Sequence, residues 1–115
     1  MSTAASRLRN RLDVSDEARR HLVHVESEAR ELLAGVAARP DGDPALAASA
    51  AGLAGFLDGA RSPLLRALDR RGTDLDAGGL ARRSLDHAWI ALRGRATRAI
   101  ERHDAAVDVE RALRR

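Results

Sequence analysis

The chain has 115 residues, which is enough for one domain with a single hydrophobic core. It contains no cysteine, which excludes disulfides, thiolate nucleophiles and thiolate metal sites. Its basic residues are all arginine, and a net charge of only +3 does not by itself indicate a nucleic-acid-binding protein.

The apolar composition opposes a β-sheet. Alanine and leucine dominate, and the aromatic residues are one Trp and one Phe. Strands favour β-branched and aromatic residues, whereas Ala and Leu are strong helix formers. Because alanine buries little area, a core built from it is thin and gains from a partner chain. We therefore expect an all-α fold, either a helical hairpin or a small helical bundle with a long C-terminal helix.

The first expected helix covers residues 15–38. Ser15 is a good N-cap, and Asp16 and Glu17 place negative charge in the first turn, where the helix dipole favours it. The helix should end before Pro40, which disfavours helical geometry in the preceding residue. Residues 1–13 are expected to form a flexible basic arm ahead of a single helical domain over residues 14–115.

A second helix is expected over residues 44–61. It follows the pair Asp43 and Pro44, which is typical of an N-cap followed by the first helical residue. Ala51, Gly55 and Gly59 follow one another at steps of four. In a water-exposed protein such a line of small residues indicates close packing against a neighbouring helix, and we expect that packing here.

Two further helices are expected, over residues 63–71 and 80–114. Ser62 and Pro63 repeat the capping signal, which indicates either this new helix or a kink in the second helix. Gly78 and Gly79 predict a break before the last helix. The last helix carries an apolar stripe at steps of three and four, which places it on one helical face. We predict that this stripe lies in the core or at an interface: Leu85, Trp89, Leu92, Ala96, Ile100, His103 and Val107.

The Ala- and Leu-rich pattern of the chain resembles that of the WXG-type small helical-hairpin proteins of actinobacterial type VII secretion systems. The similarity is carried by the stretches that begin at Leu53, Leu64 and Ala105, together with a Pro/Gly loop near the first third. The resemblance implies helical hairpins that pair as dimers. The chain departs from the family pattern, because its only Trp, Trp89, is followed by Ile90 rather than by x-Gly, and because it has no Tyr for the family's C-terminal signal.

One flank of the first helix combines histidines and carboxylates. The residues recur at steps of four and three: Glu17, His21, His24, Glu28 and Glu31. Such a set can bind a divalent metal when a facing helix adds ligands, and His21, His24 and Glu28 are the candidates. The available facing residues, Asp86, His87 and His103, form no second Glu-x-x-His pair, so a solvated flank is the preferred interpretation and we expect no metal or other cofactor.

A basic patch on the last helix offers the other candidate site. Its arginines could contact phosphate: Arg93, Arg95, Arg98 and Arg102. Aromatic residues for base stacking are absent from this patch. The chain also lacks the nucleophile, phosphate-loop, dinucleotide and zinc-protease motifs, so we do not expect an enzyme.

We therefore predict a non-enzymatic helical protein–protein interaction module that forms a homodimer or a heterodimer with another helical protein. The alternatives are an Arg-rich nucleic-acid-binding protein and a metal-binding helical bundle. The N-terminal residues contain no apolar core of a Sec signal peptide. The longest apolar stretch, residues 44–57, is shorter than the ~20 residues that span a bilayer. We expect a cytoplasmic location or, alternatively, export without a Sec signal.

Overall fold

The computed structural model describes residues 4–40, 42–59 and 75–115, and only the backbone of residues 4–15 and 75–79. In these ranges the chain forms three α-helices and no strand: α1 (Ala4–Ala37), α2 (Pro44–Gly59) and α4 (Leu75–Leu113). The all-α fold with a long C-terminal helix, predicted from composition and periodicity, is confirmed. The predicted short helix over residues 63–71 lies outside the described residues.

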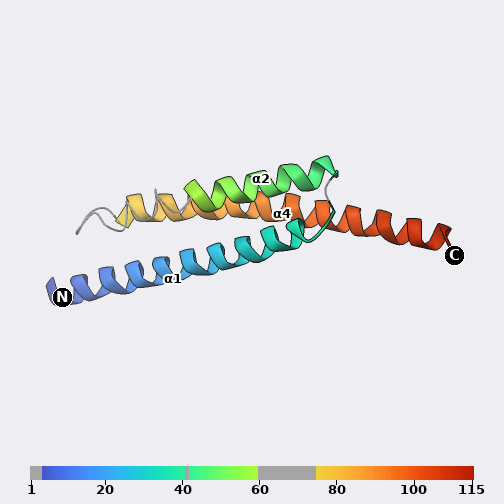
Figure 1. Ribbon diagram of the computed structural model, residues 1–115. Helices are drawn as coiled ribbons and strands as arrows, with labels where there is room; N and C mark the ends of the chain where they lie inside the picture. The colour runs from blue at the N-terminus through green and yellow to red at the C-terminus, as the bar shows by residue number, and fades with distance from the viewer. Residues whose placement is uncertain (1–3, 41, 60–74) are drawn as a thin grey trace.

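Successive described helices reverse direction along the long axis of the molecule. α1 and α4 lie parallel to each other, and α2 runs antiparallel to both (Figure 1). Each helix packs against the other two. They share one buried core, formed by Leu22, Val25, Ala29, Val36, Leu46, Leu53, Phe56, Leu85, Trp89, Ala96 and Ala99.

The molecule is a rod with extents of 73 × 22 × 17 Å. Its radius of gyration is 19.3 Å, whereas a compact domain of this length has a radius of about 13 Å. Its accessible surface is 8246 Å², compared with about 6,100 Å² for a compact monomer of the same mass. The chain therefore keeps an unusually large share of its surface outside the core.

α1 begins at Ala4, well before the predicted start at Ser15. The prediction of a flexible arm is therefore wrong for residues 4–13, which are helical. No Pro or Gly occurs in α1 before Gly35, and the Ala, Arg and Leu residues ahead of Ser15 favour helix, so nothing stops the helix at the capping signal. α1 ends close to its predicted end, and the connection to α2 contains Gly42 with a positive φ of 114°.

α2 begins where the capping signal placed it. The backbone N–H of Ala45 donates to the Asp43 Oδ1 atom at 2.9 Å. Leu46, Leu53 and Phe56 are buried on the inner face of α2. The last described residue of α2 is Gly59, so the predicted end at residue 61 lies beyond the described residues.

The small-residue line on α2 does not form the predicted close contact. Ala51 is exposed, and a Cβ atom added at Gly55 or Gly59 would meet no atom of the described residues within 4 Å. The close approach occurs instead at Gly52, where an added Cβ would lie 2.9 Å from the Leu92 Cδ2 atom of α4. The reason is helical phase, because Gly52 lies nearer to the buried face of α2 than Gly55 does.

α4 begins at Leu75 and passes through Gly78 and Gly79 without the predicted break. Each of these glycines weakens the helix by about 0.5–1 kcal/mol relative to alanine. Extending a helix that already exists adds one hydrogen bond per residue, so two glycines near an end do not stop it. α4 ends at Leu113, within one residue of the prediction.

Candidate functional site

Three polar pairs cross the line of contact between α1 and α4, which we call the seam. Glu17 Oε1 lies 3.6 Å from Arg82 Nη1, His21 Nε2 lies 2.5 Å from Asp86 Oδ1, and an Arg39–Asp104 pair closes the far end. Each pair joins residues that are 65 positions apart. A constant offset means that two parallel helices keep one register over the length of the seam.

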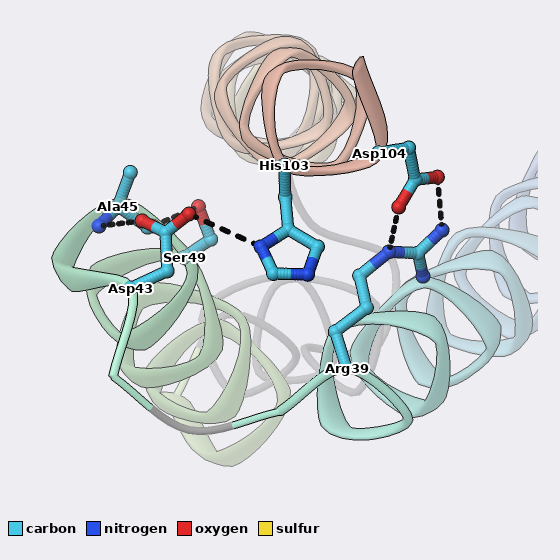
Figure 2. A network of polar contacts seen from close by, with 6 residues as sticks. All are labelled: Arg39, Asp43, Ala45, Ser49, His103 and Asp104. Atoms are coloured by element: carbon cyan, nitrogen blue, oxygen red, sulfur yellow. Dashed lines mark hydrogen bonds and ion pairs between the residues drawn. The ribbon is translucent and has the colours of Figure 1, made fainter. Parts of the chain in front are cut away.

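The Arg39–Asp104 pair has the fork geometry of a strong ion pair (Figure 2). Arg39 Nε donates to Asp104 Oδ1 at 3.0 Å, and Nη2 donates to Oδ2 at 2.7 Å. The third guanidinium nitrogen, Nη1, donates to the Gly35 carbonyl and so helps to cap α1. The hydrogen bond from Arg39 lowers the pKa of Asp104, and the same bond raises the pKa of Arg39.

His103 lies beside this pair and faces the start of α2. Its Nδ1 atom is 3.5 Å from Asp43 Oδ2, and Asp43 also caps α2 through its other oxygen (Figure 2). The His103 side chain is only 17% exposed. Asp43, His103, Arg39 and Asp104 therefore hold the α1–α2 connection against α4. We call these four residues the clasp.

α4 continues beyond the clasp. By the register of the seam, the end of α1 lies beside Arg102, and in Figure 1 the C-terminal end of α4 projects past the α1–α2 connection. We call residues 105–113 the overhang. Within it Val109 is 60% exposed and Leu113 is 81% exposed, while Val107 is half-buried. The overhang is thus a helical segment with large apolar side chains in water.

The predicted apolar stripe of α4 faces the other two helices of the same chain. Leu85, Trp89 and Ala96 are buried in the core, and Leu92 and Ile100 pack against it from partly buried positions. The Trp89 ring stacks on Phe56, with ring centroids 5.6 Å apart and planes 29° apart. His103 and Val107 are half-buried. Trp89 therefore anchors the core of this chain.

The histidines and carboxylates of α1 are divided between different partners. His21 contacts Asp86 of α4, whereas His24 Nε2 lies 3.3 Å from Glu28 Oε1 on the same helix. Glu17 contacts Arg82, and Glu31 is exposed. Among the described residues no three His, Asp or Glu side chains gather as a metal site would require. The candidates His21, His24 and Glu28 are thus not brought together as one set of ligands.

The arginines proposed for phosphate contact lie outside the core. Arg93, Arg95, Arg98 and Arg102 are all exposed. None of them forms an ion pair within the described parts of the chain, whereas Arg30, Arg39, Arg82 and Arg114 each contact a carboxylate. These four unpaired arginines therefore place positive charge along the outside of α4.

Sequence reasoning missed the clasp and the overhang. The sequence indicates Asp43 as a cap, but its link to His103 depends on the register between α2 and α4. The position of Arg39 before Pro40 gives no sign of its contact with Asp104. The one available signal was the mismatch in length between the first and last helices, which already implied that part of the long helix would extend beyond its neighbours.

Comparison with protein-family models, with curated proteins and with solved structures finds no match for this chain. No described helix is both long enough and apolar enough to cross a membrane.

Proposed function

We propose that this chain is a non-enzymatic helical interaction module that packs against another helical chain through α4. The observation that carries the proposal is the overhang, where Val109 and Leu113 are exposed on the end of α4 that projects past the α1–α2 connection. The partner is a second copy of the chain or another helical protein.

The energetics of the overhang support this function. The overhang keeps its helical hydrogen bonds because it continues α4, but it leaves the side chains of Val109 and Leu113 in water. Covering exposed apolar area contributes roughly 25 cal/mol per Å². The excess of accessible surface over that of a compact monomer also exceeds the roughly 800 Å² that each partner buries in a standard interface.

The resemblance to WXG-type proteins supplies a more specific form of the proposal. Helical hairpins of that family pair with other hairpins, and here α1 and α2 form a hairpin joined by Pro40 and Gly42. The partner would then be a second hairpin encoded beside this chain. A cytoplasmic location, or export without a Sec signal, belongs to the same proposal.

Sedimentation and unfolding of the purified chain at 1–100 µM test the function. We expect either a mass that rises with concentration or a monomer whose unfolding free energy lies near the lower end of the usual range, about 5 kcal/mol. Where a dimer forms, Val109→Gln with Leu113→Gln should disperse it. The matched control, Val23→Gln with Ile90→Gln, removes two other exposed large apolar residues outside the overhang and should not disperse the dimer. A monomer with high stability that does not depend on concentration would overturn the proposal.

A further inference from the structure

A second stripe runs along α4 on the side away from the core. Its residues recur at steps of four and three and all are exposed: Ala91, Arg95, Arg98, Arg102, Ala105, Val109 and Leu113. This spacing keeps one helical face in line over about six turns. We call this set the outer stripe. Its first half is basic and its second half, in the overhang, is apolar.

The charge on the outer stripe has no counterpart within the described parts of the chain. Arg95, Arg98 and Arg102 contact no carboxylate there, and Glu101 at the edge of the stripe is the nearest acidic residue in sequence. At Gly94 an added Cβ would lie 3.6 Å from Arg98 Nη1, so the Arg98 guanidinium lies beside the backbone of Gly94, which has no side chain. The guanidinium groups are therefore available to a ligand that approaches the outside of α4.

We propose that the outer stripe binds an acidic amphipathic helix of another protein, whose carboxylates meet Arg95, Arg98 and Arg102 and whose apolar residues cover Val109 and Leu113. This inference rests on the proposed function and specifies the partner. Carboxylates spaced three and four apart on a helix match the arginine spacing, and Arg binds carboxylates through two parallel hydrogen bonds.

The composition of the stripe favours this partner over two others. A phosphate backbone would meet the arginines, but it gains nothing from Val109 and Leu113. A second copy could cover Val109 and Leu113, but its own outer stripe holds arginines and no carboxylate among the described side chains. Pairing two outer stripes in parallel would oppose arginine to arginine, which is repulsive. Pairing them antiparallel would place arginines against Val109 and Leu113, which leaves the charges without a counterpart.

Fluorescence anisotropy on the full chain at about 150 mM salt tests the assignment. The first probe is a labelled helical peptide with three Glu and then two Leu on one face, and the second has the same residues in reverse order. Each has a version with Gln in place of Glu. The last probe is a 25-base-pair DNA duplex. We expect one of the Glu peptides to bind at least tenfold more tightly than its Gln version. Arg95→Gln with Arg98→Gln should weaken that binding at least tenfold, and so should Val109→Gln with Leu113→Gln.

The matched control is Arg20→Gln with Arg111→Gln, which removes the same charge from exposed positions off the stripe and should change the dissociation constant less than twofold. Circular dichroism confirms that each variant is folded. Equal binding of the Glu and Gln peptides would overturn the acidic partner while leaving the proposed function in place. A self-dimer would also overturn the acidic partner if Val109→Gln with Leu113→Gln disperses it and Arg95→Gln with Arg98→Gln does not.

Tighter binding of the DNA than of any peptide, lost with Arg95 and Arg98 but unaffected at Val109 and Leu113, would assign the stripe to phosphates instead. Failure of every probe to bind would overturn the inference. If the chain were then also a highly stable monomer in sedimentation and unfolding, the proposed function would fail with it.

Discussion

Replacing Trp89 by alanine should be the most damaging single change in the described core. The Trp89 side chain is only 4% exposed and stacks on Phe56 of α2, so it joins α4 to the antiparallel helix at the centre of the rod. Leu53, the only large residue with essentially no exposure among those described, lies in the same core. No other aromatic residue in the chain can take the place of the indole ring.

The expected loss follows from the buried area. A buried Trp removes about 150–250 Å² from water, which at roughly 25 cal/mol per Å² corresponds to about 4–6 kcal/mol. Aromatic truncations in protein cores cost about 3–5 kcal/mol once partial collapse of the cavity is included. A small domain has only about 5–15 kcal/mol of stability in total. Trp89→Ala should therefore leave the chain largely unfolded or close to unfolding at 25 °C.

Urea unfolding followed by circular dichroism at 222 nm measures this, because the variant lacks the only Trp. The matched control is Ile90→Ala at the next position, where the side chain is 60% exposed and the loss should stay within about 0.5 kcal/mol. Trp89→Phe keeps a ring against Phe56 and should recover much of the loss. If Trp89→Ala unfolded at nearly the same urea concentration as Ile90→Ala, the assignment of Trp89 to the core would be refuted.

Three other predictions test the packing and the clasp. Gly52→Ala should be less stable than Gly55→Ala by about 1 kcal/mol or more in urea unfolding, because the new methyl group meets α4 at position 52 and not at position 55. Equal stabilities would contradict the close approach of α4 at Gly52. Asp104→Asn should lower the melting temperature at pH 7 relative to the parent chain. Because Arg39 lowers the pKa of the Asp104 carboxyl, the ion pair is lost on protonation, and the gap in melting temperature between parent and variant should shrink as the pH falls below about 4. A gap that does not change with pH would count against the pair. Asp43→Ala should cost about 0.5–2 kcal/mol through loss of the α2 cap, and no change in the thermal or urea midpoint would show that the cap is dispensable.

The helices and the inner stripe of α4 could be predicted because they depend on local signals. The period of 3.6 residues places Leu85, Trp89 and Ala96 on one face whatever the tertiary structure, and all three are buried. The start of α2 depended on Asp43 and Pro44, which are adjacent in the chain. Such features are contained within a few turns of sequence.

The features that the sequence did not predict depend on relations between helices or on competing local preferences. Choosing Gly52 over Gly55 as the point of close packing requires knowledge of the rotation of α2 relative to α4, which no local pattern sets. The constant offset of 65 residues, which pairs Arg39 with Asp104, is likewise a property of two packed helices. At the N-terminus a good cap at Ser15 was outweighed by a run of helix formers ahead of it.

We propose that the outer face and the C-terminal end of α4 lack a helical neighbour when the chain is alone. The most direct test is the free energy of unfolding of the chain by itself, measured in urea at several concentrations between 1 and 100 µM with Trp89 fluorescence as the probe. We expect either a value near 5 kcal/mol or one that rises with concentration. A value above about 10 kcal/mol that does not change over this range, for a chain that sediments as a monomer, would contradict it.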